Sequence, residues 1–513
     1  MNRSNNLKLI KEKNKTFDFL IIGGGCNGLG VSIEASSRGY SVGLIEKNDF
    51  GSETSSKSTK LIHGGIRYLK MFDFKMVLTS LKERSFFLKN APHLIKKINL
   101  IIPFYNFFDV IYYTFGVFMY NLIFPNKDFN KIKFFNKKDL LKYFKNINPT
   151  RLYGGISFQD GKFDDSRAII TFARTASNLG SILLNYCEVI SFNVNNECIA
   201  DVKIYDRLNK NYISVSSNVV INATGSNVSL FLKKNKINEK INSLLSRGSH
   251  IVISEKFFSS NHGLLIPKST DNRVIFAIPW LGKILVGTTD IPTDLPNNPT
   301  IDNNEIDFLL NEIGKYLKNK PKKKDILSVF SGLRVLISNK NENSTKFLSR
   351  ESKIILSNEL LISVYGGKWT TYRELSEKVV DYAIKMRLVK NSSSVSKHLK
   401  LHGYVKDIIN EDYSNYGSDS VHLKNLNNNS KSLSKKFFLT ENHIIWAVKK
   451  EMAQTLEDVM CRRTRCFLLD ANESLRLAPI VAKIMAKELN KGDSWISNEI
   501  LNFNTFYKLN FGL

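Results

Sequence analysis

The sequence predicts a chain of mixed α/β and α+β class with three parts: a Rossmann-like dinucleotide-binding domain, an antiparallel-sheet domain and a C-terminal helical domain. Residues 17–46 read as strand, glycine turn, helix and strand. Residues 249–289 contain the β-type runs HIVIS, RVIFAIPW and KILVGTTD. Residues 440–490 have helical periodicity. The length of 513 residues, 42% of them hydrophobic, suits a folded protein of two or three domains.

The first unit starts with an apolar run over residues 17–22, which predicts a buried parallel strand. A helix is expected from about residue 27 to residue 38, and Gly39 ends it. A second apolar run, residues 40–45, predicts the next strand. This is the order of a dinucleotide-binding βαβ unit.

Three glycines and one acid give this unit its binding signature. Gly23, Gly25 and Gly28 are spaced as GxGxxG. The first permits a tight turn, the second lets a pyrophosphate approach the backbone, and the third lets helix and strand pack closely. Glu46 follows the second strand, where a carboxylate accepts hydrogen bonds from a ribose 2′-OH and disfavours a 2′-phosphate. An ordinary glycine-rich α/β turn is the alternative.

The chain is strongly basic, with 74 Lys and Arg against 47 Asp and Glu and a net charge of +27. We attribute part of this charge to compositional drift on solvated faces. The remainder favours anionic substrates and anionic membrane surfaces. Nucleic acid is a weaker option, because basic runs such as residues 320–324 are short and lack interleaved aromatic residues.

Cysteine usage and the N-terminus indicate the compartment. The cysteines are odd in number and form no CxxC pair, so a reduced cytosolic compartment without a metal site is expected. Residues 1–16 are polar and lack an apolar core, which predicts a frayed tail rather than a signal peptide. The five cysteines are Cys26, Cys187, Cys198, Cys461 and Cys466.

Two segments follow the first unit. Residues 51–69, GSETSSKSTKLIHGGIRYL, are expected to run along the dinucleotide, with a solvated turn as the alternative for any single serine. Residues 71–88 are expected to form an amphipathic helix.

Residues 98–124 are unusually aromatic, and residues 107–124 are almost long enough to span a bilayer. Asp109, Gly116 and Asn121 interrupt this segment. Three alternatives therefore stay open: a helix that spans the membrane, a helix that lies in the membrane interface and a helix buried in the core. The Tyr, Phe and nearby Lys residues favour the interface.

The remaining segments alternate between the two sheet types. A helix closed by Gly180, a short strand and several hairpins lead to a buried strand at residues 219–225, which ends in a small-residue turn. Residues 303–317 are expected to be helical, and residues 326–336 form a strand that carries Arg334. Residues 359–377 repeat the strand, glycine-turn and helix order, and residues 390–433 are a linker or boundary.

Several cations stand where these segments meet. Such a layout is common in flavin enzymes, with the flavin between the two sheets. Convergence of several cations would indicate an anionic substrate, most simply a phosphate. His250 is either a structural or a catalytic residue. Arg334 is either functional or part of a buried ion pair. Lys368 lies near a helix start, where a cation is disfavoured, so a ligand-binding role is weighed there against none. The candidates are Arg67, His250, Arg334, Arg350 and Lys368.

The chain resembles the FAD-dependent glycerol-3-phosphate dehydrogenase family, of the aerobic, membrane-associated type. The matching stretches cover nearly the whole chain in order. They are IIGGGCNGLG, RGYSVGLIEK, TSSKSTKLIHGGIRYL, DGKFDDSRAI, NATG, RGSHIV, IPWLGKILVGTTD, SGLRVL, YGGKWTTYREL and EMAQTLEDVMCRRTRCFLLDA.

The resemblance implies oxidation of sn-glycerol 3-phosphate to dihydroxyacetone phosphate, with FAD passing the electrons to a membrane quinone. It implies a cytoplasmic enzyme bound peripherally to the inner face of the cell membrane, with a homodimer as one option for its assembly and no nucleic-acid partner. An oxidase that uses O₂ and produces hydrogen peroxide is the alternative. An amine-oxidising flavoprotein and an inactive flavin scaffold are further alternatives that the retained cations disfavour.

The resemblance also assigns residues. His250 would take the 2-OH proton, and Arg334 would stabilise the developing alkoxide charge. The substrate pocket would contain Arg67, Tyr68, Arg350 and Lys368. The FAD-binding residues would be Gly23, Gly25, Gly28, Glu46, Ser55, Ser56, His63, Gly225, Gly367 and Lys368.

Four positions depart from the family's pattern, namely Leu29, Ser32, Glu34 and Ser376. Leu29, beside the pyrophosphate turn, would tighten the packing or weaken FAD binding. The expected domains are an FAD-binding domain (residues 16–75, 150–232 and 345–390), a substrate and membrane-facing domain (76–149 and 233–344) and a C-terminal helical domain (391–513).

Overall fold

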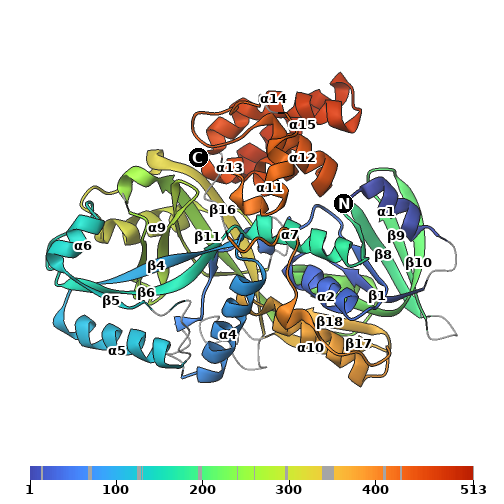
Figure 1. The fold of residues 1–513 in the computed structure, drawn as a ribbon, viewed down its shortest axis with the longest axis horizontal. Helices are drawn as coiled ribbons and strands as arrows, with labels where there is room; N and C mark the ends of the chain where they lie inside the picture. Colours follow the sequence, from blue (N-terminus) through green and yellow to red (C-terminus); the bar gives the residue numbers. More distant parts are fainter. Residues whose placement is uncertain are drawn as a thin grey trace.

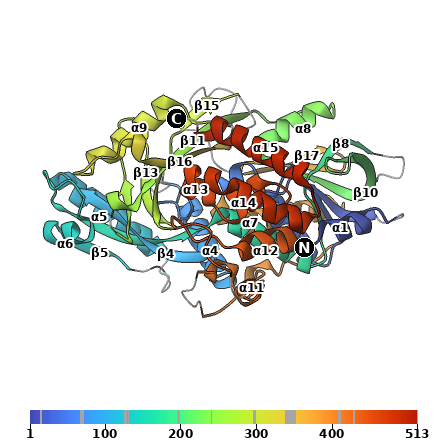
Figure 2. The same ribbon diagram turned by 90° about the horizontal axis from the view of Figure 1, so that it is seen from above.

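The computed structural model describes residues 1–12, 16–66, 72–123, 129, 131–194, 199–239, 241–258, 260–294, 299–337, 352–407, 412–427 and 430–511. Figure 1 shows two sheet regions side by side and a group of C-terminal helices on top of them. Seen from above, the C-terminal helices cross the middle of the molecule (Figure 2).

The first sheet is mostly parallel and has the order β17-β18-β10-β1-β2-β7. Strand β1 pairs in parallel with β10 and β2, and these pair in parallel with β18 and β7. The strands β8 and β9 extend β10 as an antiparallel hairpin. The bounds are β1 Thr16–Ile22, β2 Val42–Ile45, β7 Ile182–Leu184, β8 Cys187–Val194, β9 Ala200–Asp206, β10 Asn211–Asn222, β17 Lys353–Asn358 and β18 Leu361–Tyr365.

One face of this sheet is covered by α2 (Cys26–Ser37), α7 (Asp165–Asn178) and α10 (Tyr372–Lys385), which share a continuous apolar core with it. Helix α7 begins where its Asp164 carboxylate accepts hydrogen bonds from the N–H groups of Ser166 and Arg167. A second core lies on the other face, with α8 (Val228–Lys234).

The described residues 1–12 are not a frayed tail, and this prediction was wrong for them. They form α1 (Arg3–Ile10), which packs on β7. The Arg3 guanidinium pairs with the buried Asp206 carboxylate at 2.7 Å, and the Asn6 amide donates to Leu183 O at 2.8 Å. These partners lie 203 and 177 residues away in the chain, so the polar local sequence contained no sign of them.

The second sheet is mostly antiparallel, with the order β15-β11-β14-β13-β12-β4-β6-β3, and β16 and β5 pair with β11 and β6. Its longest ladder joins β11 and β16, which bring His250 opposite Phe330 and Ser246 opposite Arg334. The bounds are β3 Leu61–Ile62, β4 Ile95–Phe104, β5 Lys133–Asn136, β6 Gly154–Phe163, β11 Ser243–Ser254, β12 Gly263–Ile266, β13 Ile275–Trp280, β14 Lys283–Gly287, β15 Ile291–Thr293 and β16 Ile326–Ile337.

The helices of this region include α4 (Phe74–Asn90), α5 (Phe107–Ile123), α6 (Lys137–Tyr143) and α9 (Asn303–Lys315). The aromatic segment is therefore divided: its first residues belong to the buried strand β4, and the rest form α5. Only Val117 and Tyr120 of α5 are buried. Within the described ranges, no helix combines the length and the apolar character needed to cross a bilayer.

The C-terminal region contains α11 (Asp419–Lys424), α12 (Glu441–Glu451), α13 (Cys466–Leu469), α14 (Ala471–Leu489) and α15 (Asp493–Phe511). A wide π-helical turn, Asp458–Arg463, precedes α13. The apolar side chains of these helices join the core of the second sheet. Two segments that we assigned to the FAD-binding domain belong to the second sheet: residues 61–62 (β3) pair with β6, and residues 154–163 (β6) pair with β4. The other boundaries stay predictions.

Candidate functional site

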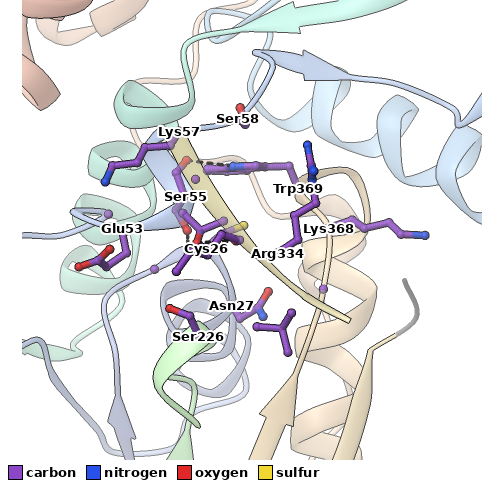
Figure 3. A pocket seen from close by; sticks show the side chains of 18 of the residues that line it. Cys26, Asn27, Glu53, Ser55, Lys57, Ser58, Ser226, Arg334, Lys368 and Trp369 are labelled. Atoms are coloured by element: carbon purple, nitrogen blue, oxygen red, sulfur yellow. Dashed lines mark hydrogen bonds between the residues drawn. The ribbon is translucent and has the colours of Figure 1, made fainter. Parts of the chain in front are cut away.

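A cavity of about 590 Å³ is lined by residues of both sheet regions. One side is formed by the glycine turn after β1, by residues of the 45–59 segment and by the turns after β10 and β18. Residues of β11 and β16 form the other side. Because β1, β10 and β18 are parallel, their carboxyl ends meet at this cavity, the usual ligand position in such sheets. Figure 3 shows part of the lining.

The glycine turn approaches its neighbours too closely for side chains. Gly23 has a φ of +109°, and a Cβ there would lie 2.6 Å from Ala223 O. A Cβ on Gly28 would collide with Gly23 O, so the third glycine allows α2 to cross β1. Gly25 caps the N-terminus of α2 and lines the cavity. The positive end of the helix dipole is thereby presented to an anion.

Glu46 follows β2 and lines the cavity. Its carboxylate accepts the N–H of Gly24 at 2.7 Å and the N–H of Asn48 at 2.8 Å, one on each oxygen. Burial raises the pKa of Glu46, and these two hydrogen bonds oppose that effect. The carboxylate is thus held in one orientation beside the turn, as a ribose-binding acid requires.

The segment after Glu46 contributes Ser55 to the lining. Ser55 Oγ accepts the N–H of Cys26 at 2.9 Å, and Ser55 O accepts Trp369 Nε1–H at 3.0 Å. His63 also lines the cavity. Ser56 is not among the described lining residues, because it is buried and its hydroxyl donates to Glu53 O.

The two later turns supply the remaining predicted cofactor residues. Gly225 (φ +61°) and Gly367 (φ +107°) both adopt a left-handed conformation and line the cavity. The Asn27 amide donates to Gly366 O at 2.8 Å and joins α2 to the turn after β18. Lys368 lines the cavity beyond this turn, and in the view of Figure 3 it lies on the same side as Arg334.

Arg334 lies on β16 with its guanidinium over Gly248 of β11, where any side chain would collide with it. It donates to Thr288 Oγ1 at 2.8 Å and to Thr289 O at 3.1 Å. Asp290 lies at 3.4 Å, and the Arg334 side chain remains 24% exposed. Its described partners hold the guanidinium in place at the cavity wall, where a cation can attract an anion.

His250 is buried on β11 and stacks on Phe330 with ring centroids 4.8 Å apart. Its Nε2 lies 2.9 Å from Thr59 Oγ1. Burial lowers the pKa of His250 well below its usual value, and the charges of Lys60 and Arg334 lower it further. The ring is therefore neutral at physiological pH, the form that can accept a proton.

Sequence reasoning missed three polar residues of this site: Thr59, Lys60 and Thr288. Thr59 and Thr288 line the cavity, one on His250 and the other on Arg334. Lys60 is fully buried, with its Nζ 4.8 Å from the centroid of the Phe330 ring. Burial together with the charge of Arg465 lowers the pKa of Lys60 to about 7. Thr59 and Lys60 lie in the hydroxyl-rich loop, but alternation within that loop could not show which side chains turn inward.

Three of the predicted substrate residues, Arg67, Tyr68 and Arg350, lie outside the described residues, so their positions stay predictions. The structure brings the other predicted residues to one cavity, except Gly28, which packs inside α2, and Ser56. Those that line the cavity are Gly23, Gly25, Glu46, Ser55, His63, Gly225, His250, Arg334, Gly367 and Lys368.

The four departures from the family's pattern are accommodated inside the protein. Leu29 is fully buried in the core between α2 and the sheet. Ser32 Oγ donates to Ser181 Oγ at 3.0 Å, and Ser376 Oγ donates to Tyr372 O at 2.8 Å. Glu34 forms a buried pair with Arg38 at 2.7 Å. None of the four lines the cavity as described.

Comparisons with known proteins agree with this arrangement. A family model described as FAD dependent oxidoreductase matches residues 18–373, and one described as C-terminal domain of alpha-glycerophosphate oxidase matches residues 361–495. The probable mitochondrial glycerol-3-phosphate dehydrogenase of Dictyostelium discoideum is 33% identical, over 98% of this chain and 86% of its own. The mitochondrial enzyme of Mus musculus is 32% identical, over 92% and 71%.

Two solved structures are also similar. The glycerol-3-phosphate dehydrogenase of Bacillus halodurans complexed with FAD is 25% identical, with a TM-score of 0.81 over 99% of this chain and 97% of that one. The L-alpha-glycerophosphate oxidase of Mycoplasma pneumoniae with FAD bound shares the fold, with 18% identity and a TM-score of 0.60 over 75% and 98%. The predicted fold class, with its C-terminal helical region, is confirmed.

Proposed function

Because the chain belongs to the FAD-dependent glycerol-3-phosphate dehydrogenase family, we propose that it oxidises sn-glycerol 3-phosphate to dihydroxyacetone phosphate and passes the electrons to a membrane quinone. The observation that supports the reaction best is the position of a neutral His250 and a cationic Arg334 on one wall of the dinucleotide cavity.

The residues of the cavity fit FAD, the cofactor of this family. Gly23 and Gly25 leave the backbone bare where a pyrophosphate would lie, and the N-terminus of α2 points to the same place. Glu46 would hold the ribose. When bound, FAD supplies the hydride acceptor.

The chain's own groups would divide the remaining work. His250 Nε2 takes the proton of the substrate's 2-OH as the hydride leaves C2, so that C2 and its oxygen become a carbonyl. Arg334 stabilises the negative charge that develops on that oxygen. Thr59 orients the imidazole by its hydrogen bond to Nε2 and must release this nitrogen to the substrate. Lys368, and Arg67, Tyr68 and Arg350 beyond the described residues, would bind the phosphate.

Helix α5 supports a membrane partner. Seven apolar side chains of this helix are exposed, and Lys133 and Lys137 lie close to it in the chain. An exposed apolar face beside basic residues suits an anionic bilayer surface, where a quinone is dissolved. Location at the inner face of the cell membrane and possible dimer formation belong to this proposal. The seven residues are Phe107, Phe108, Ile111, Tyr112, Phe115, Phe118 and Leu122.

An oxidase is the second candidate, favoured by the match of residues 361–495 to the oxidase's C-terminal domain model. The two can be separated by incubating the purified holoenzyme with glycerol 3-phosphate and either a soluble quinone without oxygen or air without quinone. We expect dihydroxyacetone phosphate to accumulate faster with quinone. Faster turnover in air, with one hydrogen peroxide per product, would establish the oxidase instead.

A further inference from the structure

Three arginines of the C-terminal region form buried ion pairs with the domain that contains the glycine turn. They lie in residues 458–465, which comprise the π-helical turn Asp458–Arg463 and the two residues after it. Their partners are two carboxylates of the first domain, Asp49 and Asp165, both with fully buried side chains. The three arginines, Arg462, Arg463 and Arg465, are themselves at most 5% exposed in their side chains.

Asp49 lies three residues after Glu46. Arg463 donates from both terminal guanidinium nitrogens to the Asp49 carboxylate, from Nη1 to Oδ2 at 2.6 Å and from Nη2 to Oδ1 at 2.8 Å. Arg462 Nε donates to the same Oδ2 at 2.6 Å. One carboxylate thus receives three charge-assisted hydrogen bonds, and the Arg462 and Arg463 charges hold its pKa below the usual value despite burial. The start of the loop after β2 is fixed by the C-terminal region.

The far end of the same segment is fixed in the same way. Arg465 Nη2 donates to Ser56 O at 3.1 Å and to Asp165 Oδ1 at 2.9 Å. The other oxygen of Asp165 accepts the N–H and the hydroxyl of Ser58 and the ammonium of Lys60, at 3.0, 2.7 and 2.6 Å. Arg465 adopts a left-handed conformation with φ of 65°, uncommon for a residue with a side chain. The turn therefore presents this guanidinium at some conformational cost.

Between these two anchors lies the segment that lines the cavity. Glu46 precedes the first anchor, Ser55 lies between the two, and Thr59, which holds His250, lies at the second. Figure 3 shows Glu53, Ser55, Lys57 and Ser58 of this segment around the cavity. We propose that residues 458–465 act indirectly on the cofactor site: their arginines hold residues 46–60 in the conformation that binds FAD.

The physical reason is the state of the two carboxylates without the arginines. Without the arginines Asp49 would lose both of its described cationic partners, and Asp165 would keep Lys60 but lose Arg465. A buried carboxylate that has lost its cations is strongly unfavourable, so these two side chains would move towards water and displace the cavity wall that they support. Binding of FAD to residues 46–60 and docking of residues 458–465 on Asp49 and Asp165 are then coupled. Coupling of this kind is reciprocal, so FAD must stabilise the docked arginines as much as they favour FAD.

The first test compares two variants of interdomain ion pairs. R463Q removes the paired guanidinium from Asp49 and leaves Arg462 in place. R174Q is the matched control, because Arg174 joins α7 to Asp419 of the C-terminal region at 2.6 Å without touching residues 46–60. The dissociation constant of FAD is measured by flavin fluorescence after the holoprotein is stripped and reloaded.

We expect R463Q to raise this constant at least about tenfold, within the range typical of coupled sites, and R174Q to leave it unchanged. Equal FAD affinity in both variants would overturn the proposal and make the arginines an ordinary interdomain contact. R463K, which keeps the charge and loses the second hydrogen bond, should fall between R463Q and the unaltered protein.

The second test needs no variant and covers the case that R463Q does not fold. Amide hydrogen exchange is compared in the unaltered protein before and after loading with FAD. We expect protection to rise in residues 458–465 together with residues 46–60. A rise confined to residues 46–60 and the other cavity segments would overturn the proposal. The inference rests on FAD as the ligand of this cavity, and failure of the stripped, folded protein to bind FAD would overturn both.

Discussion

Replacement of Arg334 by alanine tests the substrate wall most specifically. The guanidinium would stabilise the charge that develops on the substrate oxygen, and loss of one such donor from a desolvated site costs about 3 kcal/mol, or a hundredfold to a thousandfold in rate. FAD loading should be unchanged, because no residue that we assign to FAD is a hydrogen-bond partner of the Arg334 guanidinium among its described bonds.

R334A should lose stability as well as rate. Asp290 keeps a hydrogen bond from Ser246, and Thr288 and Thr289 O each lose a hydrogen bond from the charged guanidinium, which amounts to about 3 kcal/mol or more in total. Flavin reduction by glycerol 3-phosphate is followed in a stopped-flow instrument without oxygen, and FAD content is measured by absorbance.

Arg247 provides the matched control. It is the neighbour of Gly248 on β11, and its guanidinium pairs with Asp302 and Glu305, both at 2.7 Å, outside the cavity. R247A should lose a similar amount of stability and keep its rate of flavin reduction. If R334A reduced its flavin as fast as R247A, the assignment of Arg334 to the substrate wall would be refuted.

Three further outcomes are expected. E46Q places an amide NH₂ against a backbone N–H, so the FAD dissociation constant should rise about tenfold or more; an unchanged constant in a fluorescence titration would contradict the ribose role. The pKa of His250 in the folded protein is well below its unfolded value of about 6.5, so the unfolded state binds the proton first and the protein loses stability as the pH falls below 6.5. H250Q removes this effect, so its melting temperature should depend less on pH between pH 6.5 and 5 than that of the unaltered protein. Replacing Phe108 and Phe115 by aspartate should weaken binding to anionic vesicles more than tenfold in a sedimentation assay, since each ring contributes about 1.5 kcal/mol or more; the same loss with aspartate at the exposed Leu501 of α15 would make the effect nonspecific.

The dinucleotide unit could be predicted because its chemistry is local. The glycines, the strand ends and Glu46 all act within about 30 residues of one another, and GxGxxG leaves few alternative geometries. His250 and Arg334 could be named by type, but their meeting depends on the ladder of β11 with β16, which spans more than 80 residues. The sequence spacing of His250 and Arg334 does not predict that these two residues lie close together in the fold.

The misses have physical causes as well. Helix α1 is stabilised by Arg3 and Asp206, a pair that no local pattern contains. Residues 98–104 resemble the aromatic helix that follows them, but pairing with β6 makes them a strand. Lys60 is buried although lysine is almost never fully buried without an ion partner, and its partner Asp165 lies over 100 residues away in the chain. Each miss is a long-range partner that overrides a local preference.

The most direct test of the central claim is a titration of the purified holoprotein with glycerol 3-phosphate in the absence of oxygen. The account predicts that the flavin absorbance bleaches with one equivalent of substrate and that dihydroxyacetone phosphate appears in equal amount. A flavin that stays oxidised at saturating glycerol 3-phosphate, in protein that carries its full complement of FAD, would contradict the account.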